Sequence, residues 1–176
     1  MNGIIKECET RVRRTYRGGA LLDVFLGRQR GTDGFFPEDW ISSFVEAKNR
    51  DYIPGEGITR LEDGRLITDA VGGGMFGQGR TEPGVLIKLL DSGERLGIQV
   101  HPTDAYAKKL FGSDYGKTES WHVLSTRRIN DEEPKVYLGF KPGLTRELWT
   151  EYYRTQNVNA MLNALHEIPV KPGDTI

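Results

Sequence analysis

Short apolar runs separated by glycine and proline dominate the pattern along the chain, and such runs are typical of short strands. Residues 85–90 form a nearly continuous apolar run, which indicates a strand covered on both faces. A turn at 91–94 and a second apolar stretch at 96–101 predict that these two runs pair as a hairpin. Further strands are expected at 120–124, at 136–140 and, as a strand end, near 168–170.

Four segments carry apolar residues at helical spacing behind a residue that favours a helix start. These helices are expected to begin at Pro37, Thr103, Thr145 and Asn157. The first is expected to continue to Val45, and the last to end near His166. Expected strands nevertheless outnumber expected helices, so the sequence predicts a mainly β fold with helical insertions.

Two glycine-rich segments invite a nucleotide-binding interpretation. The cluster at 72–79 has no strand before it and no Gly-Lys-Ser/Thr after it, so it is expected to be a mobile connection or a substrate-side loop. The segment at 112–118 has three residues between its glycines where a phosphate-binding loop needs four, and its helix and strand come in the wrong order. Neither segment supports a nucleotide site.

Length and charge narrow the class of protein further. The chain has 176 residues, which fits a single domain over 1–176, and its formal net charge is −1. No overall positive field favours nucleic acid or an anionic membrane, and no apolar run approaches the ~20 residues that span a bilayer. The single cysteine, Cys8, suits the reducing cytoplasm. A turn-rich cytoplasmic domain is expected, with the oligomeric state left open.

The polar residues that can carry chemistry lie in the second half of the chain. Gln99 and His101 are two residues apart on an expected strand and so share a face, while Lys117 and Glu119 stand at the start of the next strand. Imidazole and carboxylate together suit Zn²⁺, and also Mn²⁺ or Fe²⁺. From the residues alone, His101 can equally be a hydrogen-bonded core histidine and Lys117 a solvated surface lysine. His122 falls on the opposite strand face, which favours a structural role.

Three segments together resemble the type I mannose-6-phosphate isomerase family: Leu-Ile-Lys-Leu-Leu-Asp at 86–91, Leu-Gly-Ile-Gln-Val-His-Pro at 96–102 and Gly-Lys-Thr-Glu-Ser-Trp at 116–121. The likeness extends to residues 139–145 and 170–174 and, more weakly, to 14–19 and 36–40, which resemble the short bacterial branch. That family consists of metal-dependent cupins. The resemblance therefore implies a cupin-type jelly roll with a helical insertion over 144–166.

The resemblance also implies roles for individual residues. His101 and Glu119 match metal ligands of the family, and Gln99 matches a position that ligates the metal in some members and only lines the site in others. Lys117 matches a lysine that handles substrate, by binding it or by moving a proton. The implied cofactor is one Zn²⁺, with Mn²⁺ or Fe²⁺ as alternatives. The general base and the arginines that hold the phosphate stay open.

The implied reaction interconverts mannose 6-phosphate and fructose 6-phosphate by proton transfer between C1 and C2 through an enediol. One departure from the family matters. The Pro-Gly-Asp turn at 172–174 should lead into a strand carrying a last histidine ligand, and neither that histidine nor the expected late arginine has a counterpart. The chain is therefore expected to be a fragment, truncated before its last metal-ligand strand, with little isomerase activity and weak zinc affinity. The alternative is a non-catalytic cupin that binds a sugar phosphate; a cupin dioxygenase lacks the clustered second histidine.

Overall fold

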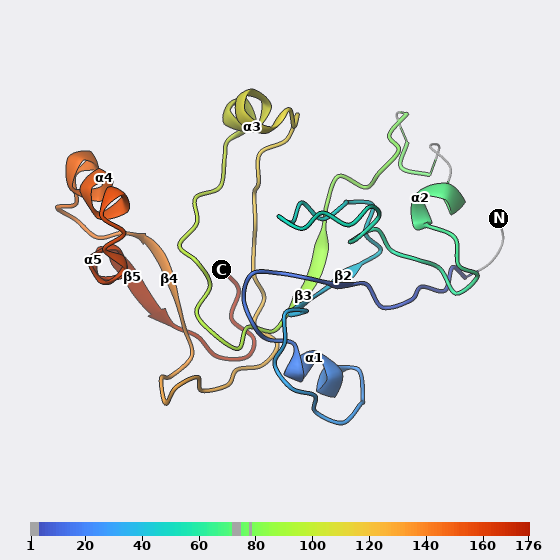
Figure 1. Ribbon diagram of the computed structural model, residues 1–176, viewed down its shortest axis with the longest axis horizontal. Coiled ribbons are helices and arrows are strands. Elements are labelled where there is room, and N and C mark those ends of the chain that lie inside the picture. The colour runs from blue at the N-terminus through green and yellow to red at the C-terminus, as the bar shows by residue number, and fades with distance from the viewer. Residues whose placement is uncertain (1–3, 72–74, 78) are drawn as a thin grey trace. The chain divides into compact units, whose positions relative to one another are not determined.

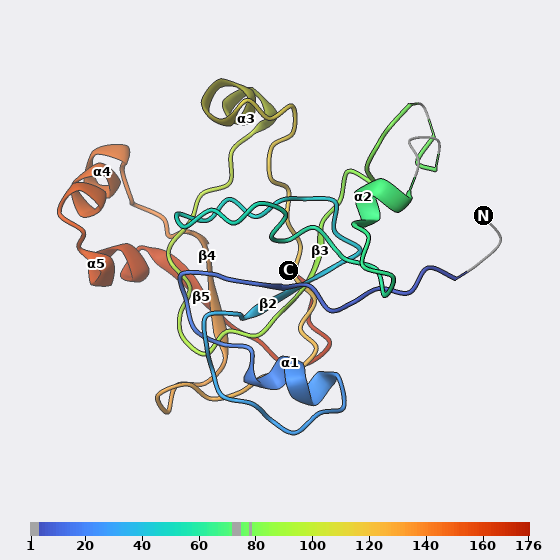
Figure 2. The same cartoon turned by 45° about the vertical axis from the view of Figure 1, so that its right-hand side comes forward.

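The computed structural model describes residues 4–71, 75–77 and 79–176, so half of the glycine cluster at 72–79 lies outside the described residues. The chain forms two compact units, Met1–Ile98 and Gln99–Ile176. Figures 1 and 2 show the short helices and strands of each unit, joined by long irregular connections. Among the described residues, no helix is long and apolar enough to cross a bilayer.

The first unit contains a three-stranded antiparallel sheet in the order β1-β2-β3, of which β2 and β3 are labelled in Figure 1. Its strands are β1 (Arg11–Val12), β2 (Glu38–Ile41) and β3 (Ile87–Leu90), and its helices are α1 (Ala20–Phe25) and α2 (Ile67–Ala70). In the register, Arg11 faces Asp39 and Trp40 faces Lys88. The central strand β2 is thus hydrogen-bonded on both edges.

Two small apolar clusters form the core of the first unit. One joins the sheet to a following loop and contains Val12, Trp40 and Ala47, with Leu86 packed against them. The other lies around α2 and contains Leu61, Ile67, Ala70 and Val71, covered by partly buried residues that include Phe44 and Phe76. The Phe44 and Phe76 rings meet edge to face with centroids 5.3 Å apart. Burial of these side chains from loops, helix and sheet ties the unit together.

The prediction of a helix from Pro37 to Val45 is wrong, because residues 38–41 form the strand β2. Apolar positions 40, 41, 44 and 45 do fit a helical stripe, but tertiary context overrides such local patterns. As a central strand, β2 satisfies its backbone groups through β1 and β3 and buries Trp40, which is 4% exposed. Pro37 precedes the strand, where its missing N–H costs no ladder bond.

The expected hairpin of 85–90 with 96–101 is also wrong in its pairing. The first strand forms as β3, but β3 pairs with β2, and residues 96–101 form no strand. The expected cover on both faces is also wrong, since Ile87 and Leu90 of β3 are exposed. The chain after β3 is held elsewhere: the Asp91 carboxylate accepts hydrogen bonds from the N–H groups of Gly19 (3.0 Å) and Leu21 (2.7 Å), and Gly93 N donates to the Arg17 carbonyl. These bonds turn 91–93 towards the loop before α1 instead of back along β3.

Glu38 is a buried carboxylate at the centre of the first unit, with only 3% of its side chain exposed. Tyr16 Oη and Trp40 Nε1 donate hydrogen bonds to it at 2.6 and 2.7 Å, and the cations of Arg14 and Lys88 lie 3.2 and 3.3 Å away. Burial opposes ionisation and is the largest single influence on the pKa of Glu38. The two donated hydrogen bonds and the two cations together outweigh burial and hold that pKa below its ordinary value.

The second unit contains a two-stranded antiparallel sheet of β4 (Lys135–Phe140) and β5 (Leu165–Pro169), with helices α3 (Asp104–Phe111), α4 (Arg146–Arg154) and α5 (Val158–Asn163). All three expected helices here are confirmed. Thr145 Oγ1 accepts the Leu148 N–H before α4, and Asn157 Oδ1 accepts the Ala160 N–H before α5. The expected strand at 136–140 is confirmed as part of β4.

Other expectations for the second unit need correction. His166 lies on β5 and not at a helix end, because α5 stops at Asn163 and the chain then pairs with β4. The strand expected at 120–124 is reduced to one bridge between His122 and Thr175, with backbone hydrogen bonds between Trp121 and Ile176 and from Val123 N to the Asp174 carbonyl on either side of it. Within the described ranges the short sheets do not close into a barrel, so a mainly β architecture is seen only as two small antiparallel sheets with helices.

Replacing Glu38 with glutamine tests whether the buried carboxylate holds the first unit together. Glu38→Gln leaves Arg14 and Lys88 without their counter-charge, so the free energy of unfolding is expected to fall by about 3 kcal/mol. Urea unfolding followed by tryptophan fluorescence at pH 7 measures the loss. The matched control is Glu62→Gln, whose ion pair with Lys6 is exposed at 3.7 Å and contributes at most about 1 kcal/mol.

The loss in free energy of unfolding caused by Glu38→Gln should depend on pH. Because the pKa of Glu38 is lower in the folded state than in the unfolded chain, the carboxylate stabilises the fold at pH values above the unfolded pKa. This stabilisation is lost as the pH falls through the folded pKa. The stability difference between the native protein and Glu38→Gln should therefore shrink below about pH 4. An equal difference at pH 7 and pH 3, or a variant as stable as Glu62→Gln, contradicts the assignment.

Candidate functional site

Three polar side chains that the sequence singles out converge in the second unit. His101 Nε2 lies 3.2 Å from Glu119 Oε2, and Lys117 Nζ lies 3.4 Å from the same oxygen. The distance from Lys117 Nζ to His101 Nε2 is 3.3 Å. The three atoms thus form a nearly equilateral triangle, called here the His–Lys–Glu triangle. Its side chains are partly exposed, at 32% for His101, 46% for Lys117 and 26% for Glu119.

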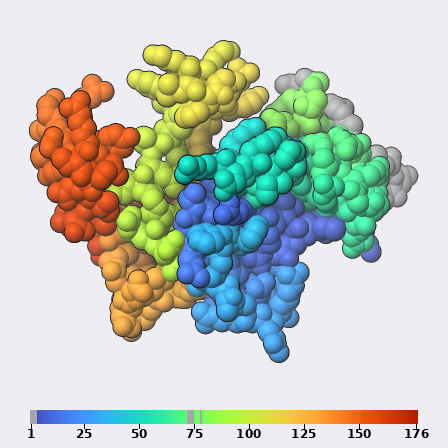
Figure 3. Space-filling model, in the orientation of Figure 1, coloured from blue at the N-terminus to red at the C-terminus, as the bar shows by residue number. Residues whose placement is uncertain are grey.

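The chain reaches this arrangement by an excursion through α3. Figures 1 and 2 show that the chain enters and leaves the segment around α3 on the same side, and the α3 side chains lie on the surface in yellow in Figure 3. Thr103 precedes the helix and Gly112 ends it at φ 66°. On the return, Lys117 N donates to the Pro102 carbonyl at 3.1 Å, and Gly116 N donates to Asp104 Oδ1 at 2.7 Å. These two bonds join Pro102 and the first residue of α3 to the segment that follows the helix.

Gly116 is required for this close approach of two backbone segments. A Cβ atom at position 116 would lie 2.5 Å from the Pro102 carbonyl oxygen and 2.9 Å from Asp104 N. Both atoms belong to backbone and cannot swing away, so any larger residue forces the segments apart. Glycine therefore permits Lys117, the next residue, to lie beside His101.

The triangle is a self-compensated group of charges. One ammonium faces one carboxylate, and the imidazole nitrogen between them can take either role. When His101 Nε2 carries a proton it donates to Glu119; when it does not, it accepts from Lys117 Nζ. The ring nitrogen can therefore donate a hydrogen bond to Glu119 or accept one from Lys117.

The donor atoms of His101 and Glu119 fit a divalent cation. Two ligand atoms on a tetrahedral Zn²⁺, with bonds of about 2.0–2.2 Å, lie about 3.4 Å apart. The observed 3.2 Å between His101 Nε2 and Glu119 Oε2 is close to this spacing, and one imidazole with one carboxylate is a donor set that zinc accepts. In the part of the chain that the structure describes, no group of three or more His, Cys, Asp and Glu side chains could hold a metal ion. The pair is therefore an incomplete ligand set.

The other candidates are placed differently. Gln99 is exposed in an irregular segment, and in the described ranges its side chain makes no hydrogen bond to the triangle. The expected strand that would aim Gln99 and His101 at one face does not form. His122 Nδ1 lies 2.8 Å from Thr175 Oγ1, beside paired backbone bonds between Trp121 and Ile176, so its contacts are structural.

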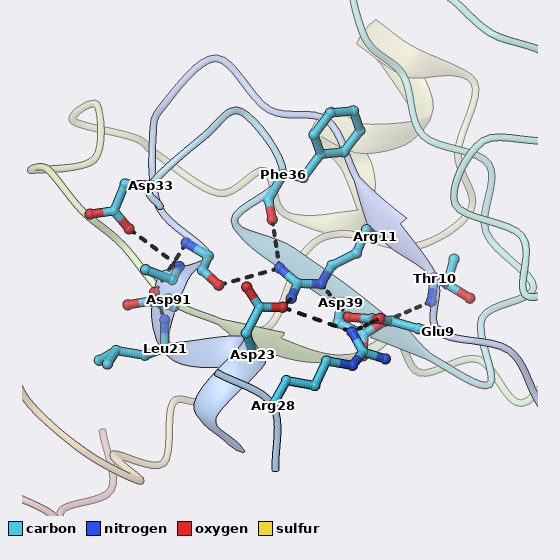
Figure 4. A network of polar contacts seen from close by, with 12 residues as sticks. Glu9, Thr10, Arg11, Leu21, Asp23, Arg28, Asp33, Phe36, Asp39 and Asp91 are labelled. Atoms are coloured by element: carbon cyan, nitrogen blue, oxygen red, sulfur yellow. Dashed lines mark hydrogen bonds and ion pairs between the residues drawn. The ribbon is translucent and has the colours of Figure 1, made fainter. Parts of the chain in front are cut away.

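A second polar cluster, in the first unit, was not expected from the sequence (Figure 4). Arg11 donates to Glu9, to Asp23 Oδ1 at 2.8 Å and to the Phe36 carbonyl at 3.1 Å, while Arg28 donates to Glu9 Oε2 at 2.6 Å. These residues line an open cavity of about 300 Å³. Arg11 and Arg28 pair with the carboxylates of Glu9 and Asp23, and the buried Asp39 lies near both arginines, so the cluster is a network of internal ion pairs. Its members come from separate segments, and no local motif marks them.

The geometry defines a class of protein: one with small antiparallel sheets that carries a histidine, a lysine and a glutamate close together at the base of a helical excursion. Comparisons with known proteins make this specific. The chain is 34% identical over 99 residues to a probable mannose-6-phosphate isomerase, GmuF, of Bacillus subtilis, an alignment that covers 56% of this chain and 29% of the relative. It is 37% identical over 92 residues to the mannose-6-phosphate isomerase of Streptococcus mutans, covering 51% of this chain and 26% of the relative. No family model matches the chain.

A solved structure agrees with these relatives at the level of the fold. The mannose 6-phosphate isomerase from Bacillus subtilis matches 97% of this chain with a TM-score of 0.62 and 24% sequence identity. The chain spans 51% of the length of that protein. The chain is therefore homologous to bacterial mannose-6-phosphate isomerases and shares the fold of part of one of them.

Substituting Gly116 tests whether the close backbone approach builds the triangle. Gly116→Ala is expected to lower the free energy of unfolding by about 2 kcal/mol and to separate Lys117 from His101, because the added Cβ meets backbone atoms. Nuclear Overhauser contacts between the His101 ring and the Lys117 side chain measure the separation. Gly97→Ala is the control, since a Cβ there meets nothing within 4 Å. Unchanged contacts in Gly116→Ala would show that the triangle does not depend on this approach.

Proposed function

We propose that this chain carries part of the active site of a metal-dependent aldose–ketose isomerase that interconverts mannose 6-phosphate and fructose 6-phosphate. The observation that supports this most directly is the His–Lys–Glu triangle, in which three atoms of different chemistry lie 3.2–3.4 Å apart. Homology to bacterial mannose-6-phosphate isomerases supplies the substrate class. A cytoplasmic location and a hexose 6-phosphate substrate are part of the same proposal.

In this proposal His101 and Glu119 hold one Zn²⁺, with Mn²⁺ or Fe²⁺ as alternatives, and Gln99 adds its amide oxygen or lines the site. When bound, a divalent cation supplies Lewis-acid polarisation of the sugar oxygens at C1 and C2. We also propose that the two units belong to one cupin-type jelly-roll domain, of which this chain forms part. The segment 144–166, which contains α4 and α5, is its helical insertion.

Lys117 is proposed as the residue that acts on the substrate. Isomerisation moves a proton between C1 and C2, and a carbon-bound proton beside a carbonyl needs a positioned acid or base. Lys117 Nζ stands within 3.4 Å of both neighbours, so its proton is already shared with groups that can accept hydrogen bonds. From that position its ammonium can hydrogen-bond a sugar oxygen that develops negative charge. Glu119 keeps the ammonium oriented.

A second function has an observation in its favour. The described residues supply one histidine and one glutamate to the site and no group of three ligating side chains. Catalytic zinc sites ordinarily have three protein ligands, so two ligands hold the metal loosely and weaken the Lewis-acid help that conversion of a sugar phosphate needs. A non-catalytic cupin that binds a sugar phosphate is therefore the alternative function of this chain.

Metal binding separates the metal-ligand interpretation of His101 from that of an ordinary hydrogen-bonded histidine. We expect the native chain to bind zinc weakly and His101→Ala to lose about 10- to 100-fold in affinity or all measurable binding. Competition with a chromophoric chelator measures both. His166→Ala, which removes an exposed histidine on β5, is the matched control and should bind as the native chain does. Equal zinc affinity in His101→Ala and His166→Ala rules His101 out as a ligand.

Removing the charge of Lys117 should have the opposite effect on metal. In Lys117→Met a cation within 3.4 Å of both donor atoms is lost, so zinc affinity is expected to rise about 10-fold through reduced repulsion, while sugar-phosphate binding falls. Lys109→Met, an exposed lysine on α3, is the control for general charge effects. Zinc titration and equilibrium binding of mannose 6-phosphate measure the two changes. A surface-lysine role predicts that both variants behave alike.

The isomerase and sugar-phosphate-binder functions differ in turnover. Because the site has two ligating side chains, the 176-residue chain with zinc is expected to show kcat/KM for mannose 6-phosphate at least about 100-fold below that of a full-length relative. A coupled assay for fructose 6-phosphate formation measures it. Turnover comparable to that of the relative would contradict an incomplete site, and sugar-phosphate binding without any turnover would favour the binder.

A further inference from the structure

Asp104 makes a contact that its place at the start of a helix does not explain. It is the first residue of α3, where a carboxylate ordinarily stabilises the free N–H groups of its own first turn. The preceding residue, Thr103, makes no side-chain capping bond to the helix. Asp104 Oδ1 instead accepts the N–H of Gly116, which lies twelve residues further along the chain, at 2.7 Å. The acid therefore binds the returning segment.

This bond acts together with one between backbone groups. Lys117 N donates to the Pro102 carbonyl at 3.1 Å. Two neighbouring N–H groups of the segment after α3, those of Gly116 and Lys117, are therefore hydrogen-bonded to Asp104 and Pro102 where the excursion begins. A hydrogen bond to an ionised acceptor is shorter and stronger than one between neutral groups. The side chain of Asp104 is the part of this double attachment that a substitution can remove.

The attachment lies directly beside the triangle. His101 precedes Pro102 and Lys117 follows Gly116, so fixing Pro102 and Gly116 fixes the backbone of both triangle residues. The ion pairs of the triangle itself join partly exposed side chains, and such pairs hold backbone segments weakly. The attachment therefore restrains the backbone of both segments directly, in addition to the charged side chains that face each other.

We propose that Asp104 is a positioning residue for this site: by accepting the Gly116 N–H it sets the distance between His101 and the Lys117–Glu119 segment. The proposal rests on the proposed function of the triangle as a metal and substrate site. The proposal predicts which property of the side chain at position 104 is needed to keep the site in place. An oxygen acceptor at the position of Oδ1 is required, so asparagine should serve and alanine should not.

The experiment compares three variants of the full chain. Asp104→Ala should weaken Co²⁺ binding about 10-fold, whereas Asp104→Asn should stay within about 3-fold of the native chain. Asp114→Ala is the matched control, because Asp114 lies on the same excursion and pairs with Lys108 at 2.8 Å on the exposed surface. The visible absorption of bound Co²⁺ gives affinity and ligand geometry, and circular dichroism compares the folding of the variants.

Two results would overturn the proposal. The first is Co²⁺ binding by Asp104→Ala as tight as that by Asp114→Ala. The second is an equal loss of Co²⁺ affinity in Asp104→Asn and Asp104→Ala, which would assign the effect to the charge at the helix start. If Asp104→Ala does not fold, hydrogen exchange in the native chain decides: slow exchange of the Gly116 amide supports the proposal, and exchange as fast as in an open loop refutes it.

Failure of the proposed function gives a different result. If the native chain binds no Co²⁺, the metal site is refuted, and contacts between the His101 ring and the Lys117 side chain then report positioning by themselves. Loss of these contacts in Asp104→Ala, with retention in Asp104→Asn, supports the positioning role. Retention in both variants refutes it.

Discussion

The close approach of Gly116 and Lys117 to the backbone at 102–104 is the constraint on which the candidate site depends. Two hydrogen bonds, at 2.7 and 3.1 Å, close the excursion through α3, and the absence of a side chain at Gly116 makes the approach possible. The helix itself contributes little to chemistry. It spaces the start and the end of the excursion so that His101 and Glu119, eighteen residues apart, face each other at 3.2 Å.

The two units use charge in contrasting ways. Glu38 is almost fully buried and is held by two hydrogen bonds and two cations, so its ionisation belongs to the stability of the first unit. Glu119 is about a quarter exposed and faces one ammonium and one imidazole, so its partners can exchange with solvent, a cation or a substrate. A buried, fully paired carboxylate is structural, whereas a partly exposed one within reach of a titratable nitrogen is available for binding.

Features governed by neighbouring residues were predictable from the sequence. The helices behind Thr103, Thr145 and Asn157 form as expected, because the signals for a helix start lie within one turn; the side chains of Thr145 and Asn157 cap their helices, whereas Thr103 makes no side-chain cap. Strand pairing was not predictable, since β3 pairs with β2, which lies some fifty residues earlier and carries a helix-like pattern. The first-unit cluster around Arg11 was missed for the same reason: its members meet only after the loops are placed.

For the site, the motif pairs His101 with Glu119 and the structure brings them together, while the strand that would have aimed Gln99 is absent from the described residues.

The central claim is that one imidazole nitrogen and one carboxylate oxygen, brought together by the α3 excursion, form a ligand pair for a divalent cation. The most direct measurement is a crystal structure of the chain grown with zinc, with anomalous diffraction recorded on both sides of the zinc absorption edge. The account predicts an anomalous peak within about 2.2 Å of both His101 Nε2 and Glu119 Oε2. Zinc found only at other residues, with these two atoms still paired to each other and to Lys117, would contradict it.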